Sequence, residues 1–202
     1  DINGALADFT RAIEIEPQNP VAYSNRGNFR FNLKDVNSAI SDYTKAIEIN
    51  PQFAEAYYGR GLCKGSLEDF HGALADYSRA TGINPQFAEA YYESGDCKYD
   101  LKDFKGAVSE YTKAIEINPQ YSKAHYMRGA CKDELEDFGG AIADFTKAIE
   151  INPQFTDAYH YRALCKNEQD DYEGAIVDYT KAIEINPQLA TAYMEIPRKV
   201  TT

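Results

Sequence analysis

A 34-residue period constrains the fold of this chain more than any other feature of its sequence. One proline recurs at that spacing, at Pro17, Pro51, Pro85, Pro119, Pro153 and Pro187. With this proline set as position 32, five complete units cover residues 20–53, 54–87, 88–121, 122–155 and 156–189, and partial units cover residues 1–19 and 190–202. A fixed period of this length is typical of proteins that stack one small structural unit many times. The sequence therefore predicts a single array over residues 1–202, without a linker or a second domain.

Each complete unit predicts two helices, the first over positions 1–14, as in residues 54–67, and the second over positions 17–30, as in residues 70–83. Position 16 is always Asp, and a carboxylate there can accept the N–H groups that the first turn of the second helix leaves unpaired. Proline at position 32 ends that helix because it lacks an N–H donor and restricts the residue before it. Position 8 is Gly or Ala and position 20 is Ala, so the two helices of a unit can approach each other closely.

These features resemble the tetratricopeptide repeat family, which combines this period with an aromatic residue at position 4, Gly at 8, Ala at 20 and 27, and Pro at 32. The resemblance covers essentially the whole chain. It implies an all-α fold, a right-handed superhelical solenoid of stacked antiparallel helix pairs in which the first helices line a concave groove. Two positions depart from the family pattern. Position 7, usually Leu, is Arg in four units and Ser94 in one, and position 11, usually Tyr, is Arg or Lys in all five.

The residues that differ most between units lie on one side of the first helix. They occupy positions 2, 5, 6, 9, 12 and 13, which fall within a sector of about 120° on a helix that turns about 100° per residue. Units that stack identically must repeat their stacking residues, so a side that is free to differ is not needed for stacking. We call these six positions of the five first helices the stripe. The family resemblance assigns the same side to the groove.

The stripe is acidic and rich in tyrosine, with nine acidic residues, one basic residue and six aromatic residues. Such a surface suits a peptide that carries Lys or Arg, because these side chains pair with carboxylates and stack on aromatic faces. The candidate peptide-binding residues are Glu55, Tyr58, Leu62, Glu89, Tyr92, Glu93, Asp96, Tyr99, Asp100, Tyr126, Met127, Asp133, Glu134, Asp157, His160 and Tyr161. The alternative is that these variable, charged positions form only a solvated face. Tyrosines at position 5 of three consecutive units argue against that alternative.

Composition and residue groupings exclude several classes of function. A net charge of −11 argues against nucleic-acid binding, which needs a basic surface, and no apolar run approaches the roughly 18 residues that a membrane span needs. The sequence has no phosphate-binding loop, no catalytic grouping of Ser, His and Asp, and no metal-ligand spacing, so we expect no enzyme activity, no cofactor and no metal. Position 5 carries no Lys or Arg, which argues against the carboxylate clamp of chaperone-binding family members.

The four cysteines, Cys63, Cys97, Cys131 and Cys165, all lie at position 10. Equivalent helices in a stack lie ~8–10 Å apart, beyond the reach of a disulfide bond. We therefore expect the cysteines to act as small apolar residues that fill the stack. Thiols without a disulfide framework are typical of a reducing compartment, which favours a cytoplasmic protein.

The expected function is a non-enzymatic protein–protein interaction scaffold that binds a basic and aromatic peptide or protein in an acidic, Tyr-lined concave groove. The alternative is a self-assembling scaffold. Residues 1–16 predict a second helix without a first, and residues 190–196 predict the start of a first helix that Pro197 ends. The C-terminal half of one copy could therefore complete the N-terminal half of the next in a head-to-tail stack. A chain cut from a longer array would show the same ends.

Two further patterns concern stability. Position 23 is Asp wherever position 7 is Arg, and the one unit with Ser94 has Glu110 instead, which predicts an Arg–Asp bridge between the two helices of a unit. The alternative is an Arg that lies over the stack with its charge in water. Gly82 stands where the other complete units have Glu, and a glycine costs up to about 1 kcal/mol in a helix. Among the interior second helices, we therefore expect the fastest amide exchange at residues 78–84.

Overall fold

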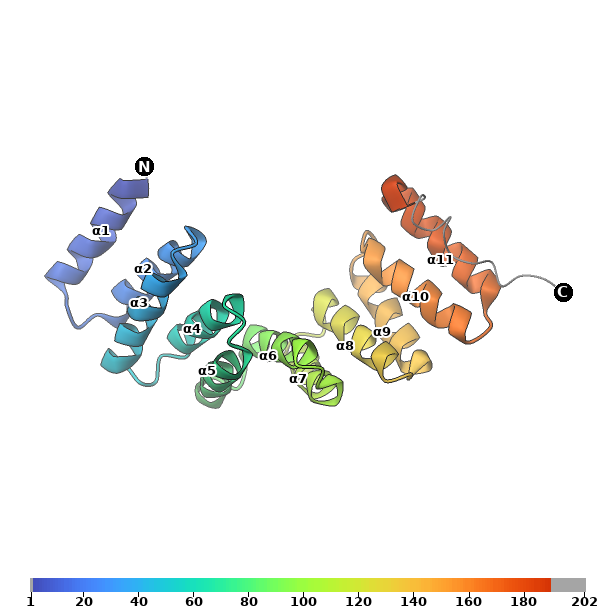
Figure 1. Cartoon of the computed structure of the whole chain (residues 1–202), viewed down its shortest axis with the longest axis horizontal. Helices are drawn as coiled ribbons and strands as arrows, with labels where there is room; N and C mark the ends of the chain where they lie inside the picture. Colours follow the sequence, from blue (N-terminus) through green and yellow to red (C-terminus); the bar gives the residue numbers. More distant parts are fainter. Residues whose placement is uncertain (1, 190–202) are drawn as a thin grey trace. The chain divides into compact units, whose positions relative to one another are not determined.

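The computed structural model of this chain describes residues 2–189, and every regular element in that part is helical (Figure 1). The eleven α-helices in residues 2–189 are α1 (Ile2–Ile15), α2 (Pro20–Asn32), α3 (Val36–Ile49), α4 (Ala54–Ser66), α5 (Phe70–Ile83), α6 (Ala88–Asp100), α7 (Phe104–Ile117), α8 (Ser122–Glu134), α9 (Phe138–Ile151), α10 (Thr156–Glu168) and α11 (Tyr172–Ile185), and a short 3₁₀ helix, η1 (Pro187–Leu189), follows. The prediction of an all-α fold is confirmed. The first helix predicted to begin in residues 190–196 lies outside the described residues.

The helices form two compact units, Asp1–Asp103 and Phe104–Thr202. In the first unit, α2 packs on α3 and α4 packs on α5, and each second helix also packs on the first helix of the next repeat, as α3 does on α4. First helices of neighbouring repeats contact each other as well, α2 with α4 and α4 with α6. The second unit follows the same order from α7 to α11, with a direct contact between α8 and α10. Each unit is therefore a stack held by contacts between sequence neighbours.

Residues at fixed positions of the repeat set the helix ends. The aspartates at position 16 begin the second helices α3, α5, α9 and α11, and each accepts with its side chain the backbone N–H three residues later. These second helices cover positions 17–30, as predicted. The first helices end at position 13, one residue earlier than predicted. The cause is the residue at position 15, which has a φ of 60–64° in every complete repeat and so makes position 14 the C-cap.

An aromatic residue at position 24 fills the space between the two helices of a repeat. Four of these rings are almost completely buried, namely those of Tyr43, Tyr77, Tyr111 and Phe145. The glycine at position 8 makes room for the ring, since a Cβ at Gly61 would lie 2.5 Å from Cε1 of Tyr77. The close approach expected from small residues at position 8 is confirmed. The four cysteines at position 10 are buried too, as expected for small residues of the stack.

A buried Asp at position 23 binds two cationic side chains from the first helix of its repeat. In the repeat 54–87, Arg60 donates from Nε to Oδ2 of Asp76 at 2.9 Å and from Nη2 to Oδ1 at 2.7 Å. Lys64 Nζ lies 2.7 Å from Oδ2 of the same carboxylate. Arg60 also donates from Nη1 to Oγ1 of Thr44 in the preceding repeat at 3.2 Å. Equivalent contacts surround Asp42, Asp144 and Asp178.

The predicted Arg–Asp bridge is therefore confirmed, and it is bidentate in four repeats. In these four repeats, we call the Arg at position 7, the Asp at position 23, the Lys or Arg at position 11 and the Thr of the preceding repeat the Arg–Asp cluster. It accounts for both departures from the family pattern, at positions 7 and 11. The link from position 11 was not part of the sequence prediction, although a cation there and an acid at position 23 in every complete repeat is a signal that could have revealed it.

The Arg–Asp cluster of the repeat 122–155 differs from the others because a buried histidine joins it. His125 Nδ1 lies 3.6 Å from Oδ1 of Asp144. Burial by itself raises the pKa of Asp144, but the nearby His125 and the cationic Arg128 and Lys132 outweigh that effect and hold the pKa well below its usual range. The carboxylate of this repeat is thus stabilised in its ionised form.

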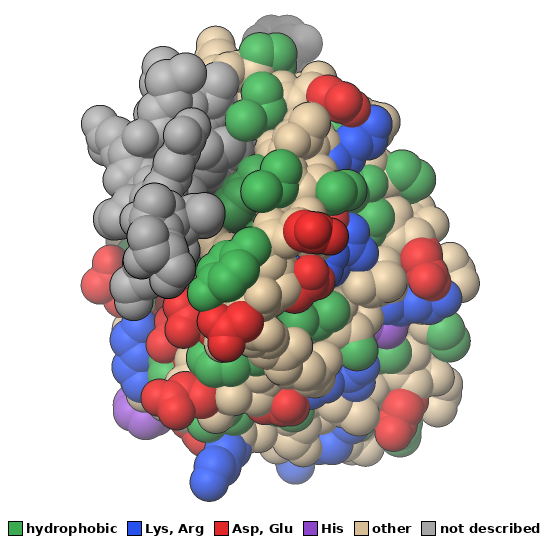
Figure 2. Space-filling model, turned by 90° about the vertical axis from the view of Figure 1, so that its right-hand side faces the viewer, with side chains coloured by type: hydrophobic (Ala, Val, Ile, Leu, Met, Phe, Trp, Pro, Cys, Tyr) green, Lys and Arg blue, Asp and Glu red, His purple; other side chains and the backbone are tan. Residues whose placement is uncertain are grey.

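Apolar side chains are exposed on α11, near the end of the described residues. Ile176 is 62% exposed and Val177 is 66% exposed. Seen from this end, the surface carries hydrophobic side chains interspersed with charged ones (Figure 2). In the other complete repeats the residue equivalent to Val177 is Ser or Ala. The large apolar residue is therefore not required by the repeat itself.

Candidate functional site

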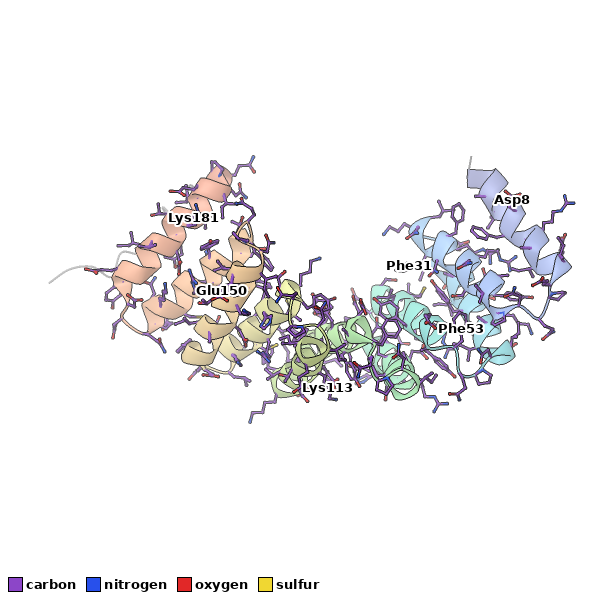
Figure 3. The ribbon with its side chains drawn as sticks, turned by 180° about the vertical axis from the view of Figure 1, so that it is seen from behind. Asp8, Phe31, Phe53, Lys113, Glu150 and Lys181 are labelled. Atoms are coloured by element: carbon purple, nitrogen blue, oxygen red, sulfur yellow. The ribbon has the colours of Figure 1, made fainter. Side chains whose placement is uncertain are left out.

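The candidate residues of the stripe lie on first helices, and each is exposed or only partly buried. In the first unit, α4 and α6 carry Glu55, Tyr58, Leu62, Glu89, Tyr92, Glu93, Asp96, Tyr99 and Asp100. In the second unit, α8 and α10 carry Tyr126, Met127, Asp133, Glu134, Asp157, His160 and Tyr161. Because α4 contacts α6 and α8 contacts α10, the candidates form two groups, which we call the first-unit stripe and the second-unit stripe. Figure 3 draws the side chains and labels Phe31, a stripe residue of α2.

Three carboxylates of the first-unit stripe lie on one face of α6. Glu93, Asp96 and Asp100 are three, four and seven residues apart, a spacing that places side chains on the same side of a helix. Burial, and to a smaller extent the negative charge of these three carboxylates, raises the pKa of the neighbouring Cys97 thiol to about 12. Burial is also the main cause of the raised pKa of Tyr77, to which Glu93 and Asp96 contribute. Negative charge is therefore concentrated at this part of α6.

Tyr58 and Tyr126, two of the three tyrosines at position 5, pack with one side against the stack. The ring centroid of Tyr58 lies 4.8 Å from that of Phe87 and 6.0 Å from that of Tyr77. In the second unit, the ring of Tyr126 lies 4.8 Å from that of Phe155. Their recurrence thus has a structural cause that the sequence did not reveal. Only the partly exposed side of each ring remains available to a partner.

The second-unit stripe contains a hydrogen bond between a cysteine and an acid, and a histidine ring beside a tyrosine ring. Cys165 in α10 donates from Sγ to Oδ1 of Asp133 in α8 at 3.3 Å. Burial raises the pKa of Asp133 more than this hydrogen bond lowers it. Burial also lowers the pKa of His160, whose ring centroid lies 5.2 Å from that of Tyr161. His160 therefore adds a largely uncharged ring to this surface at neutral pH.

Within residues 2–189, no group of three or more His, Cys, Asp or Glu side chains is placed to hold a metal ion. In the same part of the chain, no helix has the length and apolar character required to cross a membrane.

Family models place the chain among repeat proteins. A model described as tetratricopeptide repeat matches residues 20–53, 122–155 and 156–189, and a second model with the same description matches residues 64–122. The first model alone covers half of the chain. No curated protein matches the sequence.

Solved structures have the same fold. The chain is 25% identical to YrrB, a tetratricopeptide repeat protein with an unusual peptide-binding site, with a TM-score of 0.79 over 93% of this chain and 98% of that chain. It is 22% identical to the MamA protein, with a TM-score of 0.78 over 92% and 98% of the two chains. It is 17% identical to PilF of Pseudomonas aeruginosa, with a TM-score of 0.73 over 88% and 86%. The last two likenesses concern the fold alone.

Proposed function

We propose that this chain, which belongs to the tetratricopeptide repeat family, is an interaction scaffold whose first-unit stripe binds a partner segment carrying Lys or Arg. Proteins of this family are generally non-enzymatic scaffolds, and this chain is one of them. The observation that carries the proposal is the concentration of Glu93, Asp96 and Asp100 on one face of α6, beside α4. YrrB, which has a peptide-binding site, supports a peptide as the partner.

The three carboxylates are not a requirement of the repeat. The equivalent residues of α4, at positions 6, 9 and 13, are Gly59, Leu62 and Ser66, and they permit the same helix. Like charges three or four residues apart destabilise a helix by a few tenths of a kcal/mol per pair, about 0.2–0.5. The repeat does not demand these carboxylates, which makes them candidates for contact with a cationic partner.

Lys or Arg on the partner fits both kinds of side chain in this stripe. A cation can pair with the carboxylates and lie over the exposed side of a tyrosine ring. The chain itself shows the second contact, because Cζ of Arg60 lies 5.6 Å from the ring centroid of Tyr57. Tyr92 and Tyr99 flank the carboxylates on the same helix and would serve this role for a partner.

The test is binding of charge-sorted peptides to the full chain at low and moderate salt. We expect Lys/Arg-rich peptides to bind best and to weaken as salt rises, because salt screens partly exposed charge pairs. Glu93→Lys with Asp96→Lys should abolish this preference. Circular dichroism of the variant confirms that the helices remain.

A matched control reverses two acids outside the stripe. Glu14→Lys with Glu48→Lys makes the same change in net charge on the exposed sides of α1 and α3. If the control weakens binding as much as the stripe variant, only overall charge attracts the peptides and the proposed site is wrong.

Self-association is the second candidate function. Exposed Ile176 and Val177 on α11, and Ile15 on α1, which is 70% exposed, favour it, because large apolar side chains at a surface promote protein contacts. Head-to-tail stacking would use the two ends of the chain, of which residues 190–202 lie outside the described part. Sedimentation velocity at rising concentration tests it. Val177→Ser introduces a residue that other repeats have at this position and should lower the association. If the parent protein and the variant both sediment as monomers at every concentration, self-association is rejected.

We infer a cytoplasmic location from the four buried thiols, Cys63, Cys97, Cys131 and Cys165. Reduced cysteines are typical of compartments that keep thiols reduced. Fractionation of cells that express the complete protein would test this, and recovery outside the cytoplasm would reject it.

A further inference from the structure

A row of leucines lies along the turns between the first and second helices of the first unit. Leu33, Leu67 and Leu101 occupy position 14, where they are the C-caps of α2, α4 and α6. They are 39%, 52% and 38% exposed. Position 14 hardly differs between repeats, and from the sequence alone such a position is expected to be one that stacking requires. Stacking leaves a large part of each side chain in water, so it does not fully explain why Leu recurs. We call these three residues the Leu row.

The turns between the first and second helices of a repeat, which carry the Leu row, also contain charged residues. The turns that join one repeat to the next lie at the opposite edge of the stack and differ in this respect. The turns at residues 32–35, 66–69 and 100–103 contain five acidic residues and two lysines. The turns on the opposite edge, at residues 50–53 and 84–87, contain no charged residue. Acidic residues therefore flank the Leu row, and a basic partner is complementary to it.

The spacing of the Leu row fits a helical partner. First helices of neighbouring repeats are in contact, α2 with α4 and α4 with α6, and packed helices lie ~8–10 Å apart. A helix advances about 10.5 Å in seven residues, and such residues lie on nearly the same side of it. An extended strand covers about 10 Å in three residues, but side chains three apart on a strand point to opposite faces. A helix can therefore meet every leucine with one face, and a strand cannot.

We propose that the Leu row docks an amphipathic α-helix of a partner protein, with an apolar stripe of seven-residue period flanked by Lys or Arg. The apolar stripe covers the exposed parts of Leu33, Leu67 and Leu101. The flanking cations lie near the acids of the same turns, among them Glu68 and Asp69. Exposed ion pairs contribute little to affinity, so the leucines hold the partner and the charges orient it. This surface meets the first-unit stripe at Asp100, and Leu33, Leu67 and Leu101 themselves lie outside that stripe.

A natural substitution in the same array supplies the variant for the test. Position 14 of the repeat 156–189 is Gln169, and its backbone N–H caps α10 as that of Leu67 caps α4. Leu33→Gln, Leu67→Gln and Leu101→Gln should therefore preserve the fold while removing the apolar surface. Circular dichroism and thermal melting of the triple variant verify this.

The binding experiment measures fluorescence anisotropy of labelled synthetic helices with the full chain. The first probe has Leu at seven-residue period flanked by Lys, the second replaces Lys with Glu, and the third scrambles the Leu positions at constant composition. We expect the first probe to bind best. Each Leu→Gln substitution should weaken it about fivefold and the triple variant roughly a hundredfold, from the loss of partly buried Leu surface. Glu93→Lys with Asp96→Lys should have little effect, because neither residue lies at this edge.

Three results would overturn the proposal. The triple variant could bind the first probe as tightly as the parent protein, which would remove the leucines from the interaction. The three probes could bind equally, which would mean non-specific apolar adhesion. Finally, sedimentation could show that the substitutions dissociate an oligomer of this chain, which would make the occupant of the Leu row a second copy instead of a partner helix.

Discussion

Replacing Arg60 with Leu tests whether the Arg–Asp cluster holds a repeat together or only occupies a position that the family fills with Leu. Asp76 is 3% exposed, and Arg60 donates two hydrogen bonds to it, at 2.7 and 2.9 Å. The substitution removes both bonds and also the donor to Thr44. Lys64 still contacts Asp76, so the buried carboxylate keeps one cationic partner.

The expected loss of stability follows from these contacts. Hydrogen bonds to charged groups contribute about 1.5–3 kcal/mol each, so two of them amount to ~3–6 kcal/mol. The Arg60 side chain is 19% exposed, and solvent weakens its part of the pair. Leu at this position recovers about 1–2 kcal/mol through apolar burial. We therefore expect Arg60→Leu to destabilise the protein by about 2 kcal/mol. Arg60→Leu with Asp76→Leu should recover part of this, because no buried carboxylate is left while Lys64 loses its ionic partner.

Chemical denaturation with hydrogen exchange of α4 and α5 measures the effect. Exchange localises the change, which matters because repeat arrays can unfold in parts. Lys45→Leu is the control, since Lys45 is exposed and forms only a surface pair with Glu48 at 3.0 Å. We expect the control to change the free energy of unfolding by less than about 0.5 kcal/mol. If Arg60→Leu melts at the same temperature as the parent protein or higher, the bidentate bridge is not needed for stability and the reasoning is wrong.

Further predictions concern the stability of two glycine variants, the rates of amide hydrogen exchange and the pH dependence of stability. Gly82→Ala should stabilise the protein by about 0.5–1 kcal/mol, because a Cβ there meets no atom within 4 Å, whereas Gly61→Ala should destabilise it, because its Cβ would lie 2.5 Å from the Tyr77 ring. Urea denaturation of both variants measures this difference in sign. Residues 78–84 should exchange fastest among the interior second helices, and uniform protection would contradict this. Because the folded pKa of Asp144 lies below its ordinary value of 3.8, its contribution is present above about pH 4 and is lost as the pH falls lower. Asp144→Asn should therefore reduce stability at neutral pH and flatten the acid limb of the stability profile.

Much of the fold could be predicted because local rules repeat in every unit. Asp at position 16 begins a second helix through its own side chain, and Pro at position 32 prevents that helix from continuing. The Arg–Asp bridge could be predicted as well, since Ser94 and Glu110 occur in the same repeat. The sequence did not predict that Lys64 and Thr44 contact the two residues of that bridge. Their residue types allow many other contacts, and only the packed geometry selects one.

The sequence by itself determined the repeat, the helices and the side of each first helix that is free to vary, because these depend on local preferences and on a strict period. The tertiary structure decided which repeated side chains are buried. Tyr58 lies partly in the stack although its position was read as binding surface, and Leu67 remains half exposed although its position hardly varies. A residue type that recurs at one position of the repeat indicates that the position is constrained, but it does not show whether the side chain is buried or exposed. Exposure depends on which neighbouring helix covers a side chain and on how the turn at position 15 directs the chain.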